Sequence, residues 1–205
     1  MIKFEHTKVY NIIDAIRGMR NSWESWDKMD SVDVGGTIVL GENDYKLAMQ
    51  LSKAGKAHDK FLRQIFVSVD IIAPEYWWKE MDTYHFFETN SDSMMHTLGK
   101  GKLTVDDFSF DEPECSYVYD YLELINEVRS HWVDSGKKKP SPEWRLMNQL
   151  VAIAYLYRRT TTLNYAQLKS IYFDRHNHRL VEWHEFNKFA ESLPYSELIT
   201  LKEPK

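Results

Sequence analysis

The segment from Arg158 to Phe186, RRTTTLNYAQLKSIYFDRHNHRLVEWHEF, decides the fold because it joins an extended stretch to a helix. Its run of β-branched threonines favours a strand. Asn164 follows, with Gln167 three residues later, and this pair suits the exposed amides at the start of a helix. The segment therefore predicts a strand that leads directly into a capped helix.

Arg175 lies on the apolar face of this helix, because its spacing matches that of Leu168, Ile171 and Tyr172. A guanidinium among apolar residues needs a partner, since an unpaired desolvated charge is costly. That partner is either a structural carboxylate or the phosphate of a bound ligand. The sequence leaves both interpretations open.

The composition narrows the class of protein. The chain has 205 residues, of which 43% are hydrophobic, so it can bury one sizeable core and is expected to form a single domain over 1–205. A net charge of -5 and the absence of a lysine-rich tail argue against general nucleic-acid binding. No apolar run is long enough to cross a membrane, and no signal-peptide core is present, which predicts a cytoplasmic protein. The single cysteine, Cys115, excludes an internal disulfide and a cysteine zinc site.

Apolar periodicity predicts most of the other elements. Two helices are expected to open the chain, over residues 9–19 and from the cap-type residues Asn43 and Asp44 to Gly55. Residues 64–72 alternate as a half-buried strand, and residues 34–44 read as a hairpin or turn. Further helices are predicted from Val118 to about Gly136 and from Ser141 onwards, on either side of a solvated lysine-rich loop. The chain is thus mostly helical with a minority of strands.

The spacing of the opening segment resembles the flavin-dependent thymidylate synthases. Members of that family carry a T-x-N segment that enters a helix, then a leucine and an arginine four and eleven residues after the asparagine. Here those residues are Thr162, Asn164, Leu168 and Arg175. The resemblance extends over roughly residues 45–190 and implies an α+β fold with a central, mostly antiparallel sheet packed with helices.

The family's R-H-R-x-x-S-x-N-E-x-S-x-R-Y motif is only partly present. When its asparagine is placed on Asn90, the window TYHFFETNSDSMMH keeps Asn90 and Ser93 but lacks the arginines. Histidine and tyrosine cannot reproduce bidentate arginine contacts to phosphate. A cation from a neighbouring position, Lys79 or Arg63, would have to replace them.

The resemblance implies binding residues but identifies no catalytic residue. It implies that FAD is contacted by five residues: His58, Lys79, His85, Asn90 and Asn164. A nucleotide substrate would be held by Ser93, Arg159 and Arg175. The implied reaction makes dTMP from dUMP with methylenetetrahydrofolate and NADPH, in a homotetramer. The alternative is a catalytically inactive protein that keeps the fold and sequesters or senses a nucleotide.

Three other features have two interpretations each. The aromatic residues Trp77, Trp78, Tyr84, Phe86 and Phe87 either stack on an isoalloxazine ring or form core. The RHNHR segment, residues 175–179, suggests a metal, but histidines two apart diverge on a helix, so no metal site is expected. The WESWDKMD segment, residues 23–30, either covers the core or forms an oligomer contact.

Overall fold

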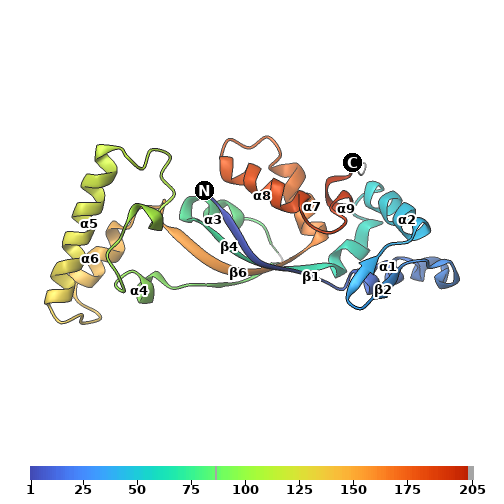
Figure 1. The fold of residues 1–205 in the computed structure, drawn as a ribbon, viewed down its shortest axis with the longest axis horizontal. Coiled ribbons are helices and arrows are strands. Elements are labelled where there is room, and N and C mark those ends of the chain that lie inside the picture. Colours follow the sequence, from blue (N-terminus) through green and yellow to red (C-terminus); the bar gives the residue numbers. More distant parts are fainter. Residues whose placement is uncertain (86, 203–205) are drawn as a thin grey trace. The chain divides into compact units, whose positions relative to one another are not determined.

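The computed structural model describes residues 1–85 and 87–202 and contains a mixed helix and antiparallel-sheet fold, as the sequence predicts. Four strands form the main sheet in the order β1-β4-β6-β5, and β2 pairs with β3 in a separate hairpin. The main strands are β1 (Lys3–Tyr10), β4 (Phe66–Pro74), β5 (Glu88–Ser91) and β6 (Leu156–Asn164). Figure 1 labels most of the elements in chain order.

The chain divides into two compact units. Unit 1 contains residues 1–3, 71–84 and 90–159, and unit 2 contains residues 4–70, 85–89 and 160–205. The boundary between them falls inside all four strands of the main sheet.

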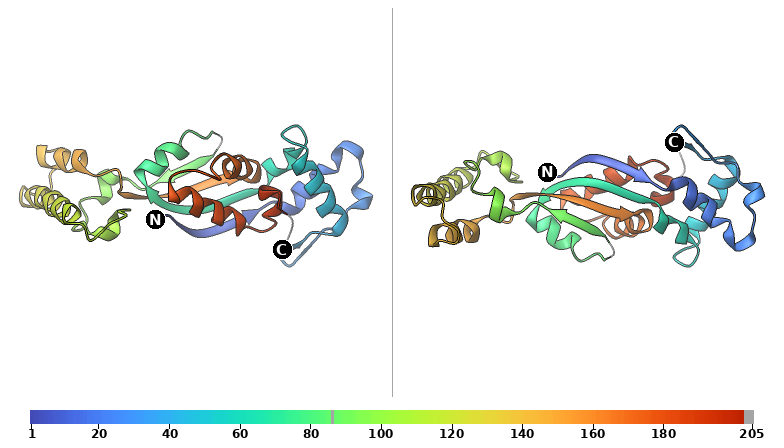
Figure 2. Two further views of the ribbon diagram at one scale, coloured as in Figure 1. Left: turned by 90° about the horizontal axis from the view of Figure 1, so that it is seen from above. Right: turned by 90° about the horizontal axis from the view of Figure 1, so that it is seen from below.

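Unit 2 holds the first helices of the chain and the last ones. Its early elements are α1 (Ile12–Met19), the 3-10 helices η1 (Asn21–Trp23) and η2 (Trp26–Lys28), β2 (Val32–Val34), β3 (Thr37–Val39), α2 (Glu42–Lys53) and η3 (Asp59–Gln64). Its late elements are α7 (Tyr165–Asp174), α8 (Val181–Glu191) and α9 (Glu197–Thr200). From above, α7 and α8 lie in front of the strands, whereas from below the strands are in front (Figure 2). These helices bury Trp183, Phe186 and Tyr172.

Unit 1 is built mainly from helices around an aromatic cluster. It contains α3 (Glu75–Met81), α4 (Met94–Thr97), the 3-10 helix η4 (Val105–Asp107), α5 (Ser116–Asp134) and α6 (Pro142–Leu150). The ring of Phe108 stacks on Phe110 at 5.1 Å and meets the edges of Tyr121 and Tyr155 at 5.5 Å. The side chain of Asn126 bonds both backbone groups of Leu103, so the segment before η4 is fixed to α5.

Most of the predicted elements are confirmed, with two corrections in the first fifty residues. Strand β1 precedes α1, so the chain does not open with two helices. Most β1 side chains are exposed, and the strand therefore lacks the apolar alternation that would reveal it. Asn43 and Asp44 lie inside α2, whose N-cap is Gly41.

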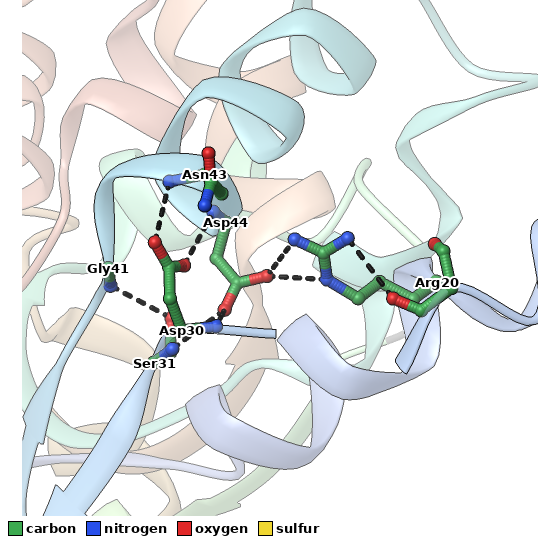
Figure 3. Close-up of polar contacts among 7 residues, drawn as sticks. Arg20, Asp30, Ser31, Gly41, Asn43 and Asp44 are labelled. Atoms are coloured by element: carbon green, nitrogen blue, oxygen red, sulfur yellow. Dashed lines mark hydrogen bonds and ion pairs between the residues drawn. The ribbon is translucent and has the colours of Figure 1, made fainter. Parts of the chain in front are cut away.

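The start of α2 is capped from a distance by Asp30. Its carboxylate accepts hydrogen bonds from the backbone amides of Asn43 at 2.9 Å and Asp44 at 3.0 Å (Figure 3). A Cβ on Gly41 would come within 2.4 Å of the Asp30 carbonyl oxygen, so only glycine allows this approach.

The carboxylate of Asp44 forms a buried ion pair with Arg20. Arg20 Nη2 lies 2.6 Å from Asp44 Oδ1, and the two side chains are 4% and 0% exposed. The other oxygen, Oδ2, accepts from the amides of Asp30 and Ser31 (Figure 3). The network joins α1, the segment before the hairpin and α2, and it satisfies a charge that would otherwise be costly to bury.

Candidate functional site

The eight residues implied by the resemblance are divided between the two units. Lys79, Asn90, Ser93 and Arg159 belong to unit 1, and His58, His85, Asn164 and Arg175 belong to unit 2. Each unit therefore presents its own group of candidate residues.

Arg159 is the most constrained candidate in unit 1. Its guanidinium carbon lies 4.3 Å from the centre of the Trp78 ring, and its Nη1 lies 2.8 Å from Asp82 Oδ1. Trp78 belongs to α3, and Asp82 follows four residues later at the C-cap of the same helix. One face of α3 thus supplies both a ring and a carboxylate to Arg159. Asp82 was not predicted, although its position four residues after Trp78 is a usable sequence signal.

Asp92 is a second residue that sequence reasoning missed. Its amide donates to the Arg158 carbonyl at 2.9 Å, and its Oδ2 accepts from the Arg158 amide at 3.3 Å. The other carboxylate oxygen is buried and has no hydrogen-bond partner within residues 1–85 and 87–202. Burial raises the pKa of Asp92, while the Arg158 hydrogen bond and the charges of Arg159 and Arg158 oppose the shift.

The other unit 1 candidates differ in their surroundings. Ser93 is the N-cap residue of α4, and its carbonyl oxygen accepts from the amides of His96 and Thr97. Its hydroxyl makes no capping hydrogen bond to α4. Lys79 on α3 and Asn90 on β5 are both exposed. Tyr157 of unit 1 donates a hydrogen bond to Met94 Sδ at 3.2 Å. Burial raises the pKa of its hydroxyl to about 12.

Asn164 closes a reciprocal cap at the start of α7. Its Oδ1 accepts from the Gln167 amide at 3.0 Å, and Gln167 Oε1 accepts from the Asn164 amide at 2.8 Å. Gln167 Nε2 also donates to the His85 carbonyl at 2.8 Å. The cap predicted from the sequence is confirmed, and it connects two of the implied flavin-contacting residues, although the His85 ring itself is exposed.

Arg175 ends α7 and stacks on a residue of α8. Its guanidinium carbon lies 4.7 Å from the centre of the Trp183 ring, which is fully buried. Its carbonyl oxygen accepts from Asn187 Nδ2 at 3.3 Å. The Trp183 ring is thus a third kind of partner for this guanidinium, beside the carboxylate and the phosphate expected from the sequence.

His58 is exposed immediately before η3. The next residue, Asp59, is buried and pairs with Lys169 of α7 at 2.8 Å. Lys169 also donates to the Ser52 carbonyl, so this one lysine connects α7 to both α2 and η3. The backbone next to His58 is therefore held by these contacts, while the His58 side chain is exposed.

The aromatic residues are mainly core. Trp77 and Trp78 are fully buried, which confirms the core interpretation for both. Tyr84 and Phe87 are half-buried, and Phe86 lies outside the described residues. Within the described part of the chain, no group of three or more His, Cys, Asp or Glu residues could hold a metal ion.

The accessible candidate side chains are of chemical kinds that bind phosphate and other polar groups. His58, Lys79, His85 and Asn90 are all exposed, and the amide of Asn164 is half-buried at a helix start. Helix starts and cations are the groups that bind phosphate in proteins. The fully buried tryptophans offer no stacking face to the isoalloxazine ring.

The fold matches solved structures over almost its whole length. The chain superimposes on thymidylate synthase X from Helicobacter pylori, determined with FAD and dUMP, with a TM-score of 0.74 and 15% identity over 98% of this chain and 97% of that one. A second structure of that enzyme with FAD and dUMP gives the same TM-score and identity over 97% of both chains. The UMP/dUMP methylase PolB from Streptomyces cacaoi, bound with 5-Br dUMP, matches with a TM-score of 0.65 and 13% identity over 98% and 95%.

These likenesses confirm the predicted resemblance at the level of fold. No protein-family model matches the sequence, and no curated protein sequence is significantly similar to it. None of the helices in residues 1–85 and 87–202 is long and apolar enough to cross a membrane.

Proposed function

We propose that this chain, which has the fold of the flavin-dependent thymidylate synthases, binds FAD and a pyrimidine nucleotide and methylates dUMP to dTMP. The methyl group would come from methylenetetrahydrofolate and the reducing power from NADPH. The observation that carries the proposal is the match over 98% of the chain to an enzyme determined with FAD and dUMP. The retained spacing from Thr162 to Arg175 supports it independently.

The arginines would bind the nucleotide phosphate. Arg159 is oriented by the Trp78 ring, and Arg175 is oriented by the Trp183 ring. A guanidinium that is already held in place loses less freedom when it binds an anion. The Ser93 hydroxyl would donate to the same ligand.

The exposed polar residues would bind the flavin. His58, Lys79, His85 and Asn90 would contact its polar edges, and Asn164 would add an amide beside the start of α7. When bound, the flavin would supply the hydride chemistry that reduces the transferred one-carbon unit. The protein residues would orient the partners and keep the nucleotide fixed during that step.

The second candidate is an inactive nucleotide-binding protein. It is favoured by the incomplete R-H-R motif, because the missing arginines are among those that would hold a flavin. Such a protein would bind dUMP but would not turn it over.

The visible spectrum of the purified protein distinguishes the two candidates. An absorbance band of bound oxidised flavin, present on isolation or after incubation with FAD, is expected for the enzyme. A protein that stays colourless but binds dUMP in a calorimetric titration would support the second candidate. A protein that binds neither ligand would contradict both.

Two charge variants test the phosphate role of Arg159. Arg159→Gln should weaken dUMP binding by about ten- to a hundredfold, because it removes one charge-assisted hydrogen bond to the phosphate. The matched variant Asp82→Asn should strengthen binding, because it releases the guanidinium from its carboxylate. Unchanged dUMP affinity in both variants would show that Arg159 does not contact the phosphate.

Arg175→Ala tests the second arginine by the same titration, together with a thermal melt without ligand. Weaker dUMP binding with a small change in melting temperature is expected, since losing a cation–π contact costs about 0.5–2 kcal/mol. Unchanged binding with a large drop in melting temperature would assign Arg175 a purely structural role.

A further inference from the structure

The polar hollow between the α7–α8 loop and α8 has no role in the proposed function. It has a volume of about 470 Å³ and is lined by His176, Asn177, His178, His184, Asn187, Lys188 and Glu191. The last four residues follow the spacing i, i+3, i+4 and i+7, so they form one continuous stripe along α8. His176, Asn177 and His178 of the RHNHR segment complete the lining. The size lies within the range of small-ligand sites.

Asn187 gives this hollow an unused hydrogen-bond acceptor. Its side chain is only 6% exposed, and its Nδ2 donates to the Arg175 carbonyl at 3.3 Å. That contact fixes the orientation of the amide, because a flipped Asn187 would oppose two oxygens. Its Oδ1 is buried and has no hydrogen-bond partner in the described residues. A ligand with an O–H or N–H donor would satisfy it.

The charges around the hollow favour an anion. Glu191 is already engaged, because its Oε1 accepts from Lys202 at 2.5 Å and from the Tyr172 hydroxyl at 2.7 Å. These bonds, with Lys202 the larger cause, lower the pKa of Glu191. Among the residues that line the hollow, the ammonium group of Lys188 is therefore a positive charge that Glu191 does not neutralise.

The histidines of the hollow differ in which ring nitrogen carries the proton. The Leu180 amide donates to His178 Nδ1 at 3.2 Å, so the ring proton of a neutral His178 lies on Nε2. His184 Nε2 lies 2.8 Å from the His178 carbonyl oxygen and must donate to it, so the nitrogen that a neutral His184 leaves for a ligand is the acceptor Nδ1. The exposed ring of His176 stands beside them in the lining.

From this arrangement we propose that the hollow is a binding site for a small phosphate monoester that also carries hydroxyl groups. Lys188 and the imidazole of His176 contact the phosphate, and Asn187 Oδ1 and the unprotonated Nδ1 of His184 accept from hydroxyl groups. The site is separate from the proposed contacts of the nucleotide, because Arg175 directs its guanidinium onto Trp183 and does not line the hollow.

The test is a titration followed by NMR of the histidine side chains, with ribose 5-phosphate, inorganic phosphate and ribose as probes. Ribose 5-phosphate should shift the His176 and His184 signals and bind about tenfold more tightly than inorganic phosphate, as one added hydrogen bond predicts. Ribose alone should bind weakest, because it lacks the charge.

Lys188→Ala provides the variant, since this lysine is exposed and its removal leaves the core intact. It should weaken binding of both phosphate probes by about tenfold. Lys56→Ala is the matched control, at an exposed lysine of the same unit outside the hollow, and should bind like the wild type. The proposal is overturned if no probe shifts the two histidines at millimolar concentration, if Lys188→Ala binds unchanged, or if ribose 5-phosphate and inorganic phosphate bind equally. Because none of the probes is dUMP, failure here leaves the nucleotide proposal standing.

Discussion

Arg20 and Asp44 form a buried charge pair whose loss should be severe. Replacing Asp44 with asparagine removes the charge that compensates Arg20 and weakens the acceptor for the Asp30 and Ser31 amides. Breaking one partner of a buried pair costs about 3–5 kcal/mol. We therefore expect Asp44→Asn to lower the free energy of unfolding by that amount, measured by urea denaturation.

The exposed pair between Glu42 and Lys46 provides the control for this prediction. It has a shorter separation, 2.5 Å, but its side chains are 78% and 70% exposed. Exposed ion pairs contribute little because water screens them. Glu42→Gln should leave the unfolding curve almost unchanged, and a similar loss in both variants would show that burial is not the cause.

Asp92 should make stability depend on pH. Its folded-state pKa is raised above the ordinary value of 3.8, so its stabilising contribution is complete below that pH and is lost as pH rises through the folded pKa. Asp92→Asn removes this loss while keeping an oxygen for the Arg158 amide. The variant should therefore melt at a higher temperature than the wild type at pH 7.

The same comparison at low pH completes the test. Below pH 3.8 the wild-type carboxyl is neutral in both states, and the two melting temperatures should converge. A difference that stays constant from pH 3 to pH 8 would attribute the effect of Asp92→Asn to packing instead of charge.

At the scale of single elements, the cap of α7 should be worth a measurable free energy. Asn164→Ala removes the acceptor for the Gln167 amide and should reduce the free energy of unfolding by about 1 kcal/mol. Asn164→Ser keeps an oxygen at that position and should recover most of the loss. If FAD binds, the serine variant should still bind it more weakly, since it lacks the amide. Equal stability of both variants would contradict the capping role.

Local signals explain why some elements could be predicted and others not. The caps of α6 and α7 use residues three positions apart, so Ser141 and Asn164 are visible in the sequence. The cap of α2 comes from Asp30, thirteen residues before the Asn43 amide it binds, and no local pattern reveals it. Strand β1 was missed for a related reason, since it is stabilised by pairing in the sheet and not by its own pattern.

The candidate residues were predictable only where spacing carried the information. Asn164 and Arg175 follow from intervals along one helix, whereas Trp183 stacks on Arg175 from the next helix. Asp82 meets Arg159 across 77 positions in the chain. Such partners are set by tertiary packing, and spacing along the chain does not reveal them. The single domain expected over 1–205 remains a prediction beside the two compact units.

At the scale of the whole molecule, we expect the protein to oligomerise. Large apolar side chains are exposed on α5 and α6, among them Leu124 at 50% and Leu146 at 44%. Exposed apolar surface of this kind marks interaction sites. Size-exclusion chromatography with light scattering should give a mass well above the 24.4 kDa of one chain.

A surface variant locates the contact. Leu124→Glu combined with Leu146→Glu should shift the mass toward 24.4 kDa, because charges would have to be buried in the interface. Glu127→Ala, at another exposed position of α5, should leave the assembly unchanged. A wild-type monomer at micromolar concentration would refute the assembly itself.

The interleaving of the two units limits how a gene for this protein can be rearranged. Each unit is assembled from three separate stretches of chain, and the boundary interrupts every strand of the main sheet. No single continuous coding fragment specifies either unit, so partial duplication or fusion cannot transfer one of them intact. The longest continuous stretches confined to one unit are Phe4–Asp70 and Asn90–Arg159. Recombination between relatives should therefore succeed most often when its crossovers lie outside these two stretches.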